Sequence, residues 1–267
     1  MDSREQNRIR AEVREHYGKV GASKVSENCC STASSCGTTR EISIKDISLS
    51  LGYSNEDVIT APAGANQGLG CGNPHAIASI KKGETVLDLG SGGGFDCFLA
   101  ARAVGEGGRV IGVDMTPEMI SRSRQNIEKT NFKNIEIRLG EIEYLPVPDA
   151  IIDVIISNCV INLSPDKEQV FREAFRVLKP GGRMAVSDVV RTAEIPDSLM
   201  QDMELYSQCV TGASEIIELE SMLQRVGFEQ IRIMPKDESK TIIRDWSPEK
   251  NVDDYVVAAS IEAVKPT

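Results

Sequence analysis

Between residues 84 and 190 the chain alternates short apolar runs with longer stretches in which apolar residues recur every three or four positions. Short apolar runs are typical of buried strands, and the longer period is typical of amphipathic helices. The pattern predicts strands at 84–89, 109–114, 135–139, 152–157 and 183–188, and helices at 95–104, 117–130 and 166–178. Strands that alternate with helices form a mainly parallel sheet covered on both faces, so we expect an α/β fold.

The N-terminal flank is less regular. Ile9, Val13 and Tyr17 are four residues apart and predict a short amphipathic helix over residues 1–20. Residues 21–40 are mostly small and polar, so we expect a mobile segment there.

A second loop, over residues 60–74, contains four glycines, which permit close approach of the backbone to a ligand. Asn73 and Pro74 then have the character of a helix N-cap and first turn, which predicts a helix at 75–81. After residue 190 we expect helices at 196–209 and 215–226 and strands at 229–234 and 253–262.

Charge excludes several classes of partner. The 267 residues include 30 basic and 40 acidic side chains, a formal net charge of -10. A nucleic-acid-binding protein needs a basic footprint, and an anionic membrane surface would repel this chain. We see no apolar stretch near the roughly 18 residues needed to span a bilayer and no apolar signal region at the start. We therefore expect a cytoplasmic protein that acts on a small molecule.

Seven cysteines stand out against this composition: Cys29, Cys30, Cys36, Cys71, Cys97, Cys159 and Cys209. An odd number in a reducing compartment argues against a disulfide framework. No C-x-x-C pair is present, so structural zinc is not expected. Cys97 lies in a predicted helix and is expected to be a core thiol. Others are candidates for chemistry.

A glycine-rich turn follows the first predicted strand. Gly90, Gly92 and Gly94 form a G-x-G-x-G pattern, which differs from the G-x-G-x-x-G spacing of dinucleotide-binding proteins. Asp88 precedes the turn by two residues, and Asp114 ends the next strand, where a carboxylate can accept both hydroxyls of a ribose.

Ile142 and Glu143 follow the third predicted strand, where an apolar side chain and a carboxylate could hold an adenine. Together with the glycine turn, these features indicate a nucleoside-containing ligand at the carboxyl ends of the strands.

The turn and segment 173–183 (Glu-Ala-Phe-Arg-Val-Leu-Lys-Pro-Gly-Gly-Arg) resemble the class I S-adenosylmethionine-dependent methyltransferases. The resemblance covers residues 75–190 and implies S-adenosylmethionine as the methyl donor; a nicotinamide-dependent dehydrogenase is the alternative. It implies a Rossmann-like, seven-stranded mixed sheet with helices on both faces, whose last strand inserts antiparallel. The cofactor-binding residues expected are Asp88, Gly90, Ser91, Gly92, Gly94, Asp114, Met115, Ile142, Glu143 and Asn158.

Three cysteines fall where this fold places its active site. Cys71 lies in the loop over 60–74, Cys159 follows the fourth strand, and Cys209 ends the helix after the fifth. Ligands of open α/β sheets bind beyond the carboxyl ends of the strands, so all three could face the transferred methyl group. Three sulfur ligands suit a thiophilic centre.

The segments around these cysteines closely resemble the arsenite methyltransferases. The matching stretches are 64–66, 68–74, 89–92, 112–116 and 157–163, with Cys209 in addition. The resemblance implies that Cys71, Cys159 and Cys209 bind trivalent arsenic as the substrate. It also implies an N-terminal cysteine that pairs with the loop cysteine; Cys36 is our choice, and Cys29 and Cys30 stay open.

The resemblance divides the chain into three parts. Residues 1–74 form an N-terminal helix and cysteine-containing active-site loops, residues 75–190 the Rossmann-like S-adenosylmethionine-binding domain, and residues 191–267 an α+β extension that binds substrate and completes the sheet. Thioredoxin or glutathione is implied as the external reductant that restores the thiols.

The chemistry of arsenite fits this set of residues. Three thiols can displace the three hydroxides of neutral arsenite and leave a lone pair on arsenic, which can attack the methyl carbon without a general base. Catalysis then depends on proximity and alignment. Two alternatives remain: a small-molecule C- or O-methyltransferase with packed cysteines, and a non-catalytic metalloid-binding protein.

Overall fold

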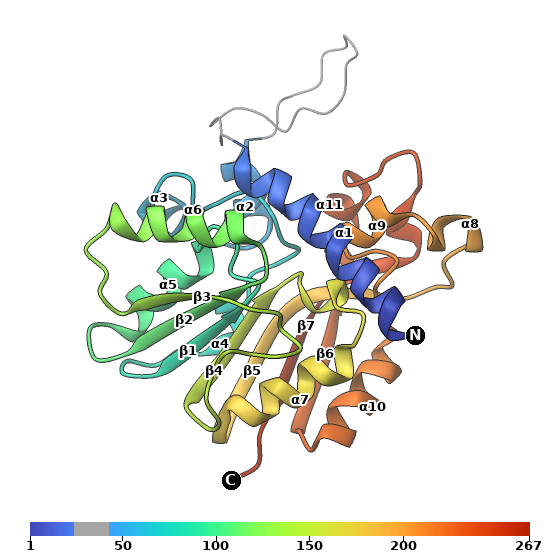
Figure 1. Cartoon of the computed structure of the whole chain (residues 1–267). Coiled ribbons are helices and arrows are strands. Elements are labelled where there is room, and N and C mark those ends of the chain that lie inside the picture. Colours follow the sequence, from blue (N-terminus) through green and yellow to red (C-terminus); the bar gives the residue numbers. More distant parts are fainter. Residues whose placement is uncertain (24–42) are drawn as a thin grey trace.

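The computed structural model describes residues 1–23 and 43–267, and its centre is a seven-stranded sheet (Figure 1). The strands are β1 (Thr85–Leu89), β2 (Arg109–Asp114), β3 (Ile135–Leu139), β4 (Ile152–Asn158), β5 (Leu178–Arg191), β6 (Glu229–Lys236) and β7 (Val256–Val264). Their order is β3-β2-β1-β4-β5-β7-β6. The first five pair in parallel, and β7 is antiparallel to both β5 and β6. The expected mixed sheet with an inserted antiparallel last strand is confirmed.

Helices cover both faces of the sheet (Figure 1). The longer ones beside it are α5 (Phe95–Val104), α6 (Pro117–Glu128), α7 (Lys167–Val177) and α10 (Ile216–Val226). One face packs against α7 and α10 through residues such as Phe171 and Leu223. The other packs against α4 (His75–Ala78), α5 and α6 through small and branched residues such as Ala100 and Ile120.

Helix α7 shows how the sequence specifies these elements. The Asp166 side chain caps its start by accepting a hydrogen bond from the Gln169 amide, and Val170, Ala174 and Val177 form a buried stripe. A stripe with this spacing lies on one face of a helix, which explains why the pattern is visible in the sequence.

A third apolar cluster lies beyond the carboxyl ends of the strands. It joins α1 (Ser3–Ala22), α9 (Met203–Ser207) and α11 (Lys240–Arg244), and includes the thiols of Cys71 and Cys209. Helix α1 crosses above the sheet at this end (Figure 1). The cluster therefore covers the edge of the sheet at which ligands of such folds bind.

Two predicted helices differ from the observed ones. The helix predicted at 75–81 ends at Ala78, because Ser79 has a left-handed backbone with φ of 48°. The helix predicted at 196–209 is split into α8 (Asp197–Met200) and α9, because the Asp202 side chain caps the second piece.

Other elements were missed. Helices α2 (Ile44–Ser50) and α3 (Asn55–Thr60) each begin with a serine capping box, and both are too short for an apolar period to show. The expected mobile segment falls almost entirely on residues 24–42, outside the described residues. In the part of the chain that is described, no helix is both long and apolar enough to cross a membrane.

Candidate active site

A cavity of about 530 Å³ opens at the carboxyl ends of β1, β2 and β4. Its lining includes all but one of the expected cofactor residues: Asp88, Gly90, Ser91, Gly92, Asp114, Met115, Ile142, Glu143 and Asn158. Gly94 does not line it. This glycine has φ of 90° at the start of α5, and a Cβ there would lie 2.8 Å from Ser123 Oγ. Gly94 thus serves the turn itself.

Asp114 holds the glycine turn. Its Oδ2 accepts a hydrogen bond from the Gly92 amide at 2.9 Å, and its Oδ1 accepts one from the Thr116 amide at 2.8 Å. Burial raises the pKa of Asp114, and these amide hydrogen bonds act in the opposite direction. The carboxylate is therefore fixed at the cavity wall, where its remaining lone pairs can accept the hydroxyls of a ribose.

Asp88 lies at the floor of the cavity. Burial, and then the charge of nearby Asp96, raise its pKa well above the ordinary value. The Cys97 thiol donates a hydrogen bond to Asp88 Oδ2 at 3.3 Å and is itself fully buried in the core. The acidic side chains of Asp88, Asp96 and Asp114 line one cavity, and a ligand with positive charge such as S-adenosylmethionine would favour their ionised forms.

Two buried polar atoms face this cavity without a partner among the described residues, Ser91 Oγ and Gln67 Nε2. Buried polar groups in proteins are normally hydrogen-bonded. Both atoms therefore fit a site that is completed by a polar ligand. Gln67 was not among the expected residues, because its position depends on the course of the loop over 60–74.

Glu143 has a second task beside the expected one. Its Oε1 accepts hydrogen bonds from Arg10 Nε at 3.0 Å and from Ser164 Oγ at 2.7 Å. Arg14 of the same helix pairs with Glu141 at 2.9 Å. These ion pairs hold α1 across the cavity. The Glu143 carboxylate, which was expected to face an adenine, therefore also anchors α1.

Asn158, the last residue of β4, binds the loop that carries Cys71. Its Oδ1 accepts a hydrogen bond from the Cys71 amide at 3.0 Å, and its Nδ2 donates to Gly72 O at 2.7 Å and to Tyr53 Oη at 3.0 Å. The Tyr53 hydroxyl in turn donates to Asp96 Oδ1 at 2.8 Å. Asn158 lines the cavity, but its amide group is engaged in positioning the cysteine loop.

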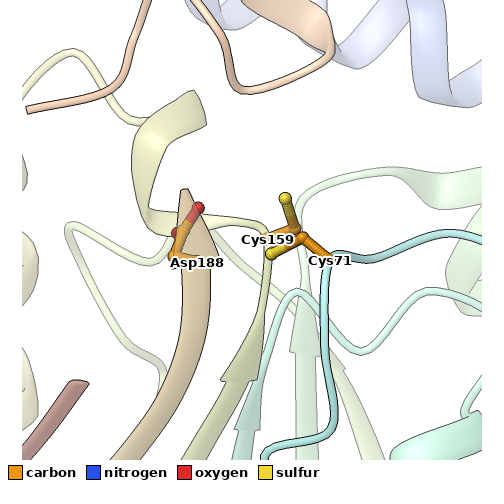
Figure 2. Close-up of side chains that lie close together, drawn as sticks. All are labelled: Cys71, Cys159 and Asp188. Atoms are coloured by element: carbon orange, nitrogen blue, oxygen red, sulfur yellow. The ribbon is translucent and has the colours of Figure 1, made fainter. Parts of the chain in front are cut away.

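The three candidate cysteines lie close together, and two of them, Cys159 and Cys209, line the cavity. Cys71, Cys159 and Cys209 are free thiols in a single apolar cluster. The sulfurs of Cys71 and Cys159 and a carboxylate oxygen of Asp188 lie within 4.8 Å of one another (Figure 2). The Cys209 thiol donates a hydrogen bond to Cys159 O at 3.0 Å.

The backbone has an uncommon conformation at two of these cysteines, Cys159 and Cys209. Cys159 and Cys209 each come just after an element ends, β4 and α9, with φ of 58° and 64°. Positive φ is uncommon outside glycine and turns the chain sharply. The Cys159 amide donates to Ser187 O at 2.7 Å, which fixes that turn against β5.

Both thiols are held in the neutral form. Hydrogen bonds with Cys209 and Cys71, and burial, raise the pKa of Cys159 well above its ordinary value. The hydrogen bond with Cys159 lowers the pKa of Cys209, but burial and the charges of Asp188 and Cys71 together raise it to about 11. A ligand that exchanges with neutral thiols is therefore favoured over one that requires thiolates.

The expected N-terminal partner cannot be placed in this site. Cys36, and the alternatives Cys29 and Cys30, lie outside the described residues. Two residues of the site were not expected from the sequence, because only the fold brings them here. The Tyr17 hydroxyl donates a hydrogen bond to Ser207 O at 2.9 Å, and Trp246 lines the cavity together with Cys209.

Comparisons with known proteins agree with this geometry. A family model described as a methyltransferase domain matches residues 80–234. The arsenite methyltransferase of Halobacterium salinarum is 49% identical, over 98% of this chain and 68% of that protein. The human arsenite methyltransferase is 34% identical, over 82% of this chain and 58% of that protein.

A solved structure is similar as well. The arsenic(III) S-adenosylmethionine methyltransferase of Chlamydomonas reinhardtii is 33% identical with a TM-score of 0.60, and the match covers 84% of this chain and 73% of that one. The methyltransferase-domain match and the 49% identity over nearly the whole chain agree with the glycine turn and the cysteine cluster. The chain belongs to the arsenite methyltransferase family of S-adenosylmethionine-dependent methyltransferases.

Proposed function

We propose that this protein transfers the methyl group of S-adenosylmethionine to trivalent arsenic held by the thiols of Cys71, Cys159 and Cys209. One observation carries the proposal: three free cysteines share an apolar cluster, and two of them, Cys159 and Cys209, line the same cavity as the glycine turn and Asp114. Donor and acceptor sites are thus adjacent, as a direct transfer requires.

Neutral thiols suit neutral arsenite. Each thiol replaces one hydroxide on arsenic, and the hydroxide leaves as water with the proton of the thiol. Three such exchanges leave the net charge of the site unchanged. The raised pKa values of Cys159 and Cys209 keep these two thiols protonated before binding. Arsenic bound by three sulfurs keeps its lone pair, which is the nucleophile of the reaction.

The residues of the chain supply position and a dry environment. S-adenosylmethionine, when bound, supplies a methyl group on a positively charged sulfur. Asn158 holds the Cys71 loop, while Val13 and Tyr17 of α1 close the cavity from above. No proton has to be removed in the transfer, so alignment of arsenic and methyl carbon accounts for the main catalytic effect.

Methyl transfer raises arsenic from the trivalent to the pentavalent state, so a second round requires reduction. We propose that a fourth thiol, from Cys36 or its neighbours Cys29 and Cys30, attacks one arsenic-bound sulfur. The thiol gives its proton to water and a disulfide forms. The As–S bond breaks, and its electron pair stays on arsenic, which returns to the trivalent state. Thioredoxin or glutathione would reduce the disulfide, which places the enzyme in a reducing compartment such as the cytoplasm.

The test is a product assay with purified full-length protein. Arsenite, S-adenosylmethionine and a thiol reductant should give methylarsenicals and S-adenosylhomocysteine in matched amounts. Cys159→Ser should abolish both products and keep the affinity for S-adenosylmethionine. Formation of S-adenosylhomocysteine on a carbon or oxygen acceptor, unaffected by Cys159→Ser, would favour a small-molecule methyltransferase. Tight arsenite binding without any product would favour a metalloid-binding protein.

A further inference from the structure

Asp188 is a buried carboxylate beside the thiols to which the proposed reaction assigns no task. It lies near the carboxyl end of β5 with 1% of its surface exposed. One of its oxygens is within 4.8 Å of the sulfurs of both Cys71 and Cys159 (Figure 2). A charge in this place, away from water, acts on anything that the thiols hold.

Four hydrogen bonds fix this carboxylate. Oδ1 accepts from Asn162 Nδ2 at 2.9 Å and from the Val189 amide at 2.8 Å. Oδ2 accepts from the Ile161 amide at 2.9 Å and from the Asn162 amide at 3.3 Å. Every partner is an N–H donor, so these hydrogen bonds favour the ionised form and oppose the effect of burial. The lone pairs are occupied, which leaves the carboxylate as a fixed charge and not as a free ligand.

The charge does not serve to activate the thiols. A negative group beside a thiol opposes thiolate formation, and Asp188 is one of the groups that raise the pKa of Cys209. A fixed negative charge is favourable instead at a step in which positive charge develops near the sulfurs.

Methyl transfer is such a step. Arsenic bound by three thiolates is neutral, and its lone pair forms the As–C bond. The S–C bond of the sulfonium breaks, and its electron pair stays on that sulfur, which becomes a neutral thioether. The positive charge thus moves from the sulfonium to arsenic, which ends with four bonds and a formal charge of +1.

We propose that Asp188 is the fixed counter-charge that stabilises the positive charge developing on arsenic during methyl transfer. This inference rests on the proposed function. An oriented anion in a water-excluded site stabilises such a charge without reorganisation. The arrangement resembles an oxyanion hole with the sign of the charge reversed.

The test compares Asp188→Asn with Asn162→Ala. The second variant removes the side-chain hydrogen bond to Asp188 and keeps the charge. Single-turnover methyl transfer should slow by about 100-fold in Asp188→Asn, the scale found when one oriented group of this type is lost, and by less than about tenfold in Asn162→Ala. Asp188→Ser provides a second uncharged variant if Asp188→Asn does not fold.

A binding measurement separates charge from structure. S-adenosylmethionine is positive at sulfur and S-adenosylhomocysteine is neutral there, so loss of the carboxylate should reduce the ratio of their affinities several-fold. Asn162→Ala should keep that ratio. Two results would overturn the inference. One is an equal loss of rate in Asp188→Asn and Asn162→Ala with an unchanged affinity ratio; the other is a wild-type rate in both Asp188→Asn and Asp188→Ser. Absence of methylarsenicals with the wild-type protein would overturn the proposed function instead.

Discussion

The Asn158 side chain accepts a hydrogen bond from the Cys71 amide at 3.0 Å, across 87 positions of the sequence. The residue that ends the fourth strand therefore positions a thiol carried by a loop that precedes the first strand. Tyr53 supports the same amide group from the other side, and its hydroxyl is bonded to Asp96 at 2.8 Å. These contacts connect the Cys71 loop to Asp96, which lines the cavity.

Asn158→Ala should weaken arsenite binding more than cofactor binding. The change leaves the Cys71 amide and Gly72 carbonyl without their partner, and a lost buried hydrogen bond costs roughly 1–3 kcal/mol, so the arsenite Kd should rise by about tenfold. Trp246, the single tryptophan, lines the cavity, so its fluorescence should report arsenite binding. Calorimetry gives the affinity for S-adenosylmethionine. A selective loss of cofactor affinity would contradict this prediction.

Arsenite affinity should be nearly independent of pH between about 6 and 8. Cys159 and Cys209 stay protonated throughout this range because their pKa values are raised, and arsenite releases water from such thiols without releasing protons. Zinc binding, in contrast, expels a proton from each thiol, so zinc affinity should rise steeply with pH. Parallel titrations with arsenite and zinc at three pH values check this; equal slopes would refute it.

Asp188 should make the folding stability depend on pH. Its pKa is raised from 3.8 to about 6, mainly by burial. The folded state then binds the proton more tightly than the unfolded state, so the cost of the buried charge is fully present above pH 6 and is relieved as the pH falls. From pH 8 to pH 5 the wild type should gain about 1.5 kcal/mol relative to Asp188→Asn. Urea unfolding of both proteins at the two pH values measures the difference; a constant difference would contradict the assignment.

Arg10→Ala should destabilise the protein by about 3 kcal/mol and weaken cofactor binding. Only 10% of the Arg10 side chain and 3% of the Glu143 side chain are exposed, and removal of one partner leaves a buried charge unpaired. The matched control is Arg14→Ala. Its pair with Glu141 is more exposed, at 42% and 31%, and should contribute less than about 1 kcal/mol.

The two variants are compared by urea unfolding and by calorimetry with S-adenosylmethionine. An equal loss of unfolding free energy in Arg10→Ala and Arg14→Ala would show that burial does not strengthen the ion pair of Arg10. A restored stability in the double variant Arg10→Met with Glu143→Gln would support the explanation by an unpaired charge.

The parts of the fold that follow local rules could be predicted from the sequence. Asp114 and the glycine turn belong to one strand-helix-strand unit, β1-α5-β2, whose two parallel strands are neighbours, and this places the carboxylate against the turn. The stripe of α7 is equally local. The split at Asp202 escaped prediction because its side chain caps α9 by accepting hydrogen bonds from the Glu204 and Leu205 amides, which outweighs a weak apolar period.

The rest of the site depends on contacts between distant segments. Arg10 meets Glu143 across 133 positions, and nothing near either residue in the sequence indicates the pair. Asp188 ends the strand predicted at 183–188 and could have been noted as a carboxylate at a strand end, as Asp114 was. Its position beside two thiols required the loop of Cys71 and the turn after β4 to be placed first.

The left-handed backbone at Cys159 and Cys209 has a consequence for how freely these positions can vary. Glycine or asparagine would adopt this conformation at a lower conformational cost, and strain of this kind costs of order 1 kcal/mol or more per residue. A population of sequences selected for thermal tolerance alone would drift away from cysteine at both places. The proposed arsenic site therefore carries a cost in folding stability at two of its three thiols.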